Sequence, residues 1–118
     1  MSVVARLPWP AREVWPNFRQ SHHWRKYARP VKLQRAEAYG LALAAGARPL
    51  SLAVIPIAVH FAPPDRRHRD DDGMVGAFKS ARDGIADALR CDDRDMRATY
   101  VFGDPDPAKR GFIEVTIG

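Results

Sequence analysis

Residues 50 to 62 form the longest apolar run in this chain of 118 residues, and Leu50 to Phe61 within it read as a long strand. Because successive side chains of a strand point to opposite faces, one face would carry Ala53, Ile55, Ile57, Val59 and Phe61, and the other Leu52, Val54, Ala58 and His60. Pro56 has no N–H for the ladder, so we expect this strand to lie at a sheet edge or to carry a bulge.

The N-terminal half supplies one more strand and a helix. Ser2 to Leu7 alternates as a strand does, and the prolines that follow predict an irregular segment without helix until about Ser21. From Ser21 to Ala45 the pattern is helical, with Leu33, Ala36, Tyr39 or Gly40, and Leu43 on one side. We expect the main helix to begin near Pro30 and to end at Gly46.

The C-terminal half predicts a second helix and two strands. Val75, Phe78, Ala81, Ile85 and Leu89 recur at helical spacing, so we expect a helix from about Gly73 to Leu89 that Asp72 caps. Met96 to Phe102 and Phe112 to Ile117 read as strands joined by a hairpin loop. The order predicts a single domain, 1–118, of the α/β or α+β class: a small mixed sheet of about four strands with two main helices.

Composition limits the chemistry. The formal charge of +5 is compatible with a polyanionic partner, although charge alone favours a soluble basic protein with no nucleic-acid role, so the argument depends on where the charges fall. Cys91 is the single cysteine, which excludes an intrachain disulfide and a cysteine-based zinc site. The first ten residues do not resemble a signal peptide, and the run from 50 to 62 is too short to cross a bilayer. We therefore expect a cytoplasmic protein with no membrane partner.

A dense cationic run stands directly against clustered carboxylates. Its residues are Pro64, Asp65, Arg66, Arg67, His68, Arg69, Asp70, Asp71 and Asp72, and Asp92 and Asp93 follow twenty residues later. Arginines hold phosphates, whereas aspartates approach a phosphate only when a divalent cation lies between them. This combination suits a metal-dependent enzyme acting on nucleic acid. The alternative interpretation is a set of solvated loop acids with a helix cap.

The spacing of the acids limits how they can meet. In extended backbone, Asp70 and Asp72 would point the same way, with Asp71 opposite. Asp92 or Asp93 follows the same predicted helix, which is about 25 Å long, so it joins them only if the helix breaks or bends, for which Gly84 offers a place. Alternatively, a partner chain completes the site.

A second basic tract precedes these acids. Arg19, His22, His23, Arg25, Lys26, Arg29, Lys32 and Arg35 run without an acid until Glu37. We expect it to bind the DNA backbone, chiefly through Arg25, Lys26, Arg29 and Lys32. Trp9, Trp15 and Trp24 could stack on unpaired bases, although aromatic residues near prolines more often anchor loops.

Together these residues resemble the RusA-type endodeoxyribonucleases, the phage and prophage Holliday junction resolvases. The motifs that carry the resemblance are Leu7-Pro8-Trp9-Pro10, Pro16-Asn17, His23-Trp24, the run from Pro64 to Asp72, and Asp92-Asp93. The resemblance implies a homodimer that binds four-way DNA junctions and cuts two opposed strands symmetrically with Mg²⁺, for which Mn²⁺ could substitute.

The resemblance also implies roles for particular residues. Asp70, Asp72 and Asp93 would be the catalytic metal ligands, with Asp92 the alternative to Asp93. The family's basic residue, usually four positions after the D-x-D pair, is Gly76 here, so Lys79 is the substitute candidate for neutralising charge in the transition state. Phosphates would be held by Arg67 and Arg69, with Arg66 and His68 as further DNA contacts.

Three hypotheses remain open at this point: a junction resolvase or broader branched-DNA nuclease, a catalytically inert DNA-binding protein, and a small basic module unrelated to DNA. Retention of all three candidate acids argues against the second, since carboxylates repel phosphate. The third predicts binding that does not weaken steeply with salt.

Overall fold

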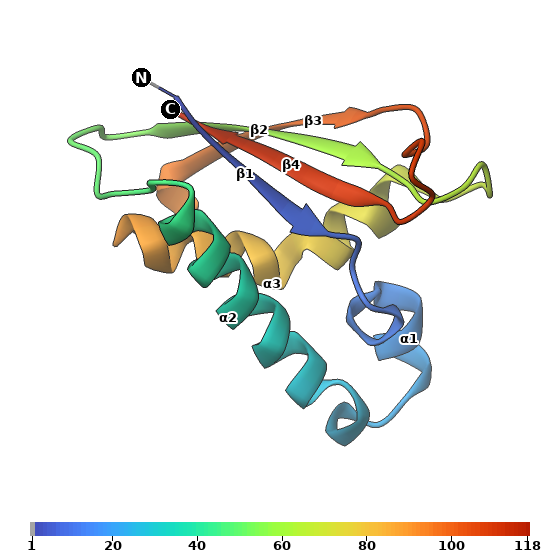
Figure 1. Ribbon diagram of the computed structural model, residues 1–118. Helices are drawn as coiled ribbons and strands as arrows, with labels where there is room; N and C mark the ends of the chain where they lie inside the picture. Colours follow the sequence, from blue (N-terminus) through green and yellow to red (C-terminus); the bar gives the residue numbers. More distant parts are fainter. Residues whose placement is uncertain (1) are drawn as a thin grey trace.

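The computed structural model describes residues 2–118 as one mixed sheet with helices on one of its faces (Figure 1). The strands are β1 (Val3–Pro8), β2 (Ile55–Ala62), β3 (Met96–Phe102) and β4 (Phe112–Ile117), in the order β1-β4-β2-β3. Strand β2 pairs with β3 in parallel, and the other pairings are antiparallel. The longer helices are α2 (Ala28–Ala44) and α3 (Asp71–Leu89). The predicted mixed sheet with two main helices is therefore confirmed.

The core lies between the sheet and its two long helices. Alternate residues of β2 are buried, from Ile55 through Val59 to Phe61, whereas Ala58 and His60 are exposed. Helix α3 buries the residues that its spacing predicted, among them Phe78, Ile85 and Leu89. Within residues 2–118, no helix covers the opposite face of the sheet (Figure 1).

Strand β2 departs from its prediction in length and in position. It begins only at Ile55, where pairing with Met96 starts, so residues 50 to 54 are not part of it. It is a central strand, not an edge. Pro56 is tolerated because pairing with β4 begins only at the next residue, Ile57. The carbonyl group of Pro56 still accepts a hydrogen bond from Gly118 N at 3.0 Å.

The predicted hairpin between the last two strands is wrong. Strand β2 lies between β3 and β4, so the loop from 103 to 111 crosses the end of β2 instead of joining neighbours. Backbone contacts hold the loop there: Gly103 N donates to Phe61 O at 2.9 Å, and Asp106 N donates to Pro63 O at 2.7 Å.

The segment predicted to lack helix contains a short one. Helix α1 (Pro16–Ser21) begins with proline, which the first turn tolerates because its N–H would have no intrahelical partner. Short 3₁₀ turns lie on either side, η1 (Arg12–Val14) and η2 (Trp24–Lys26). Helix α2 then starts at Ala28, two residues before Pro30, and a positive φ at Gly46 follows its end as expected.

The apolar side predicted for α2 does not face the core. Leu33, Tyr39 and Leu43 are 58%, 42% and 43% exposed, while the buried residues of the helix are Ala38 and Ala42. Small residues face inward because α2 lies very close to α3. A Cβ at Gly84 of α3 would come within 3.0 Å of Tyr39 N and would collide with Arg35 O.

Helix α3 is continuous from Asp71 to Leu89, so a break at Gly84, one of the two ways in which Asp92 or Asp93 could join the other acids, does not occur. The helix also begins earlier than expected. Asp70 occupies the N-cap position, and Asp72 already lies in the first turn, so Asp72 is not the cap. Within residues 2–118, no helix is both long enough and apolar enough to cross a membrane.

Candidate functional site

An open cleft of about 1110 Å³ runs past the N-terminal end of α3. It brings together three segments that are distant in the sequence, namely the aromatic and proline residues after β1, the basic loop before α3, and the acids that open the helix. The lining residues used below are Trp9, Trp15, Arg67, Arg69, Asp70 and Asp72. Cations and carboxylates thus share one cleft.

The acids do not have the extended geometry that their spacing suggested. Asp70 has extended backbone, and its carbonyl accepts a hydrogen bond from Met74 N at 3.1 Å, so the chain is helical from Asp71 onward. The predicted alignment of Asp70 with Asp72 required extended backbone throughout, and Asp71 and Asp72 are helical instead. Asp70 pairs with His68 at 3.3 Å, and Asp72 forms no ion pair with any residue of 2–118.

The basic loop is built around Asp65. Its carboxylate accepts hydrogen bonds from Arg67 N at 2.9 Å and from Arg69 Nη2 at 2.9 Å, and these contacts lower the pKa of Asp65. The Arg69 side chain is only 14% exposed and its guanidinium lies 5.5 Å from the Trp9 ring. Arg69 therefore supports the loop, whereas Arg66, Arg67 and His68 are exposed to a ligand.

A second polar cluster lies along α3. Lys79 Nζ donates to Asp83 Oδ1 at 3.3 Å and to Asp93 Oδ2 at 3.2 Å. Partial burial lowers the pKa of Lys79, but the hydrogen bonds to Asp93 and Asp83 outweigh it, so the pKa is raised overall. The hydrogen bond from Lys79 lowers the pKa of Asp93. Two residues chosen separately from the sequence, Lys79 and Asp93, are therefore in contact.

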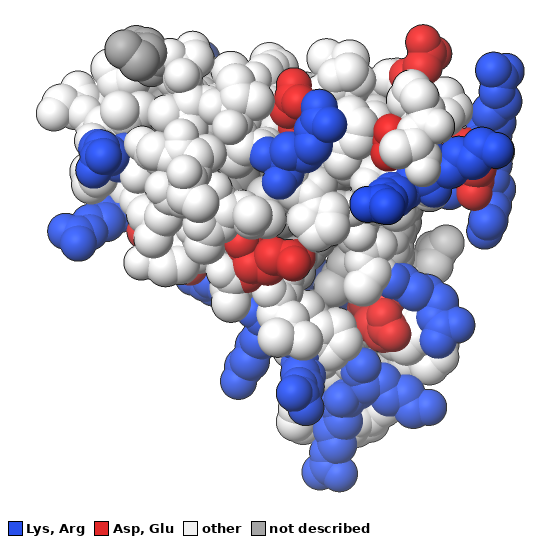
Figure 2. Space-filling model, viewed as in Figure 1, with Lys and Arg blue, Asp and Glu red and all other residues white. Residues whose placement is uncertain are grey.

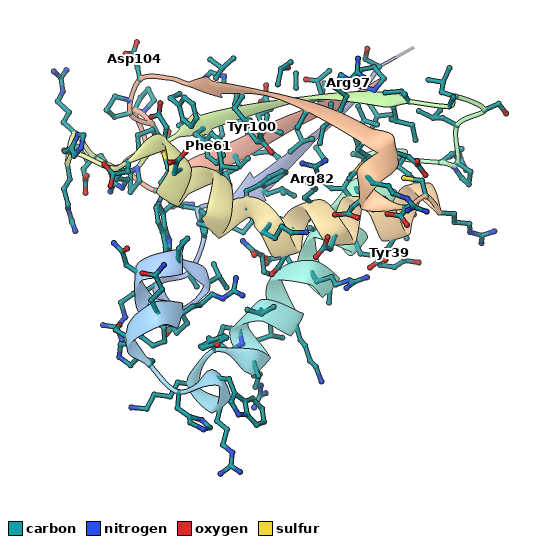
Figure 3. All side chains as sticks on the ribbon, turned by 180° about the vertical axis from the view of Figure 1, so that it is seen from behind. Tyr39, Phe61, Arg82, Arg97, Tyr100 and Asp104 are labelled. Atoms are coloured by element: carbon teal, nitrogen blue, oxygen red, sulfur yellow. The ribbon has the colours of Figure 1, made fainter. Side chains whose placement is uncertain are left out.

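Arg82 holds the segment after α3 against the helix. Its Nη2 donates to Asp93 O at 3.1 Å and to Met96 O at 2.9 Å, and its Nη1 donates to Tyr100 OH at 3.4 Å. Figure 3 labels Arg82 on α3 and Tyr100 on β3. Sequence reasoning missed both Arg82 and Asp83. The four-residue spacing of Lys79 and Asp83 could have indicated their pairing, whereas no pattern predicts the long-range contacts of Arg82.

The three predicted metal ligands are not gathered. Lys79 is seven positions after Asp72 on α3, which corresponds to about 10 Å along the helix axis. Asp93 lies beside Lys79 and is therefore at a different level of the helix from Asp72. Among residues 2–118, no three His, Cys, Asp or Glu side chains form a group that could hold a metal ion.

The donors that do fit Mg²⁺ are fewer than predicted. Asp70 and Asp72 are exposed carboxylates lining one cleft, and Mg²⁺ is commonly held by one or two carboxylates together with waters and substrate phosphates. Asp93 is engaged by Lys79 and lies outside the residues that line the cleft. The arrangement therefore does not fit the three-aspartate set, and it leaves Asp70 and Asp72 as carboxylates that share one cleft without pointing the same way.

The second basic tract forms an arm that projects from the sheet, comprising α1, η2 and the start of α2. Figure 2 shows Lys and Arg side chains gathered over this end of the molecule. Its exposed cations are Arg19, Arg25, Lys26, Arg29 and Lys32. Trp24 is 56% exposed there, with the Arg25 guanidinium 5.6 Å from its ring centroid. Trp9 and Trp15 instead pack against the core, as loop anchors do.

Comparison with known proteins gives one relative of unassigned role. No family model matches the chain. An uncharacterized protein of Xylella fastidiosa (strain Temecula1) is 45% identical over 91 residues, which is 75% of this chain. The chain spans 58% of the length of that relative.

Proposed function

We propose that this chain is a Mg²⁺-dependent endodeoxyribonuclease that cuts branched DNA, with the four-way junction as its first candidate substrate. The proposal comes from the resemblance to RusA-type resolvases. The structural observation that carries it is the shared cleft, which Asp70, Asp72 and the exposed cation Arg67 all line. Metal-dependent phosphodiester hydrolysis can use both kinds of group, carboxylates to hold the metal ion and arginines to hold phosphates.

Each group has a proposed role. Arg66 and Arg67 bind phosphates that flank the bond to be cut, since both are exposed on the loop that Asp65 and Arg69 hold in shape. Asp70 and Asp72 hold Mg²⁺, which when bound makes a water more acidic and stabilises negative charge on the phosphate. Lys79 keeps a positive charge on the flank of α3, and Asp93 and Asp83 fix its position.

The basic arm would supply much of the affinity. Arg25, Lys26, Arg29 and Lys32 are partnered by no acid within residues 2–118, so they can displace the counterions that DNA carries. Two opposed cuts require two sites related by a two-fold axis, and for that reason we propose a homodimer.

A second candidate is a DNA-binding protein without catalysis. It is favoured by one observation, namely that Asp93 is bound by Lys79 and does not stand with Asp70 and Asp72. In this alternative, the arm and the exposed loop arginines bind branched DNA, and the carboxylates hold no catalytic metal.

The test is cleavage of a labelled synthetic four-way junction with Mg²⁺, beside a linear duplex and a replication fork. Asp72→Asn removes a proposed metal ligand, and Asp104→Asn is the matched control, because Asp104 is exposed but does not line the cleft. Paired symmetric nicks that Asp72→Asn loses and Asp104→Asn retains would support a resolvase. Binding without cutting in Mg²⁺ or Mn²⁺ would leave the inert binder. Affinity that is indifferent to salt would overturn both.

A further inference from the structure

Trp24 is the most exposed of the tryptophan, tyrosine and phenylalanine side chains within residues 2–118. It is 56% exposed, against 42% for Tyr39 and 38% for Phe102. Trp9 and Trp15 differ, since both pack against the core, and Trp15 Nε1 donates a hydrogen bond to Pro10 O at 3.3 Å. Because an aromatic ring stabilises a fold mainly when it is buried, the stability of the chain does not explain the exposure of Trp24.

The position of Trp24 is fixed by the turn that carries it. Trp24 begins η2, the turn between α1 and α2. His23 accepts two hydrogen bonds there, from Lys26 N at its carbonyl oxygen (2.9 Å) and from Arg25 N at its ring Nδ1 (3.2 Å). Tyr27 N donates to Trp24 O at 3.2 Å. A ligand would therefore meet Trp24 on an ordered turn, at little cost in conformational entropy.

The neighbours of Trp24 are cations and not acids. Residues 14 to 36 contain no Asp or Glu. The Arg25 guanidinium is 5.6 Å from the centre of the Trp24 ring, and the centre of the His23 ring is also 5.6 Å away, with the two planes tilted by 34°. Neither contact covers the indole, since more than half of the side chain remains in water. Trp24 thus combines an open aromatic surface with positive charge beside it.

Unpaired nucleotides fit this combination better than an apolar protein surface does. Each nucleotide offers a flat base that stacks on an aromatic ring and a phosphate that a cation binds, and proteins commonly bind single strands in this way. An apolar partner would instead remove water from Arg25, Lys26 and Arg29, which form no ion pair within residues 2–118. Inside a duplex, a paired base is already stacked and out of reach. The chemistry therefore selects an unpaired base.

We propose that Trp24 stacks on an unpaired base of a bound DNA strand, so that the arm distinguishes single-stranded and branched DNA from fully paired duplex. This proposal rests on the proposed function in one respect, namely that DNA is the partner, and it does not require that the chain cuts DNA. Arg25 and Lys26 bind the phosphates of either kind of DNA, because both kinds carry them. Trp24 supplies the selectivity for unpaired bases.

The test compares the affinity of the full chain for a labelled oligothymidylate of about 16 nucleotides with its affinity for a duplex of the same length. Fluorescence anisotropy without divalent cations measures both. We expect Trp24→Leu to weaken single-strand binding about fivefold or more, because leucine is apolar but offers no ring on which a base can stack. Duplex affinity and the slope of log affinity against log salt should not change, since no charge is removed. Trp24→Phe should restore much of the lost affinity.

Tyr39→Leu is the matched control. Tyr39 is also an exposed aromatic residue, but it lies on α2 beyond the arm, so loss of its ring should change neither affinity. Indole fluorescence gives a second readout that does not depend on a disruptive substitution. A base stacked on Trp24 should quench its emission when oligothymidylate is added to the native chain, and Trp24→Phe should lose that quenching although Trp9 and Trp15 remain.

The outcomes separate this proposal from the proposed function. Single-strand affinity that Trp24→Leu leaves unchanged, or quenching that Trp24→Phe retains, would overturn the stacking and leave DNA binding by the cations standing. Equal weakening for single strand and duplex would mean that the ring supports the arm and does not stack on a base. A native chain that binds neither DNA would overturn both proposals. Because divalent cations are absent, failure to cleave DNA does not bear on the stacking.

Discussion

Lys79 and Asp93 are joined by a hydrogen bond of 3.2 Å although fourteen positions separate them in the chain. The contact forms because the chain turns back after α3, where Arg90 adopts a left-handed conformation, and because Arg82 holds the returning segment. An unbroken helix and a returning segment together bring Asp93 to the middle of α3, and not to the acids at its N-terminal end.

Removing the Arg82 side chain should loosen the segment that carries Asp93. Arg82→Met leaves the carbonyl groups of Asp93 and Met96 without their donor. We expect the free energy of unfolding to fall by about 2–3 kcal/mol, because hydrogen bonds to charged groups are among the stronger ones. Urea unfolding followed by circular dichroism measures it. Arg94→Met is the control: that side chain is 83% exposed, and the change should stay within about 0.5 kcal/mol.

Alanine at Gly84 should be poorly tolerated. The new Cβ would collide with Arg35 O and would crowd Tyr39 N, so α2 and α3 would have to separate. Overpacking of this kind costs about 1–3 kcal/mol. Thermal unfolding should show a lowered melting temperature. At Gly73, by contrast, the nearest atom would be Trp15 Cζ3 at an ordinary 3.7 Å, so Gly73→Ala should not destabilise the chain. Equal effects at the two positions would contradict this account of the helix contact.

Acid should destabilise the protein through its hydrogen-bonded carboxylates. In Asp106, a hydrogen bond from Ala108 N, followed by bonds from Gly111 N and Arg110 N, holds the pKa below its ordinary value. A carboxylate whose pKa is lower in the folded state than in the unfolded state stabilises the fold when it is ionised. This stabilisation is fully present above the unfolded-state pKa, about 3.9, and is lost as the pH falls through the folded-state pKa.

Asp106→Asn should therefore lose less stability than the native chain between about pH 5 and pH 2, because the amide does not titrate. The urea midpoint of unfolding, measured at several pH values for both proteins, gives the comparison. Identical pH profiles would show that the Asp106 carboxylate does not contribute in this way.

DNA binding through the arm should depend on salt. Replacing Arg25 and Lys26 together by alanine removes two proposed phosphate contacts, so the slope of log affinity against log salt should fall by about 0.9 for each contact. Fluorescence anisotropy of a labelled four-way junction measures the slope. Arg97→Ala is the control, since Arg97 is exposed on β3 of the sheet and away from the arm (Figure 3). An unchanged slope in the arm variant would remove the arm from the binding surface.

Local patterns predicted the elements better than their pairing. The residues that α3 buries, and the alternation of β2, follow from periodicity, which is a property of the chain itself. The central position of β2 in the sheet does not follow from periodicity. Pro56 suggested an edge strand, and only the structure shows that pairing with β4 begins after Pro56. The prediction of a hairpin between β3 and β4 is wrong for a similar reason, since strands that are neighbours in sequence need not pair in the sheet.

For the candidate site too, the sequence predicted the residues better than the contacts between them. The sequence alone determined which residues are able to take part: the aspartates at the start of α3, the exposed cations of the loop and arm, and Lys79. Only the tertiary structure decided which of them meet. Asp93 reaches Lys79 because Arg82 donates to carbonyl groups well beyond the helix, and Leu33 and Leu43 face outward because Gly84 draws the opposite face of α2 against α3. Residue type fixes charge and hydrogen-bonding capacity, whereas contact between distant residues depends on packing that no short stretch of sequence contains.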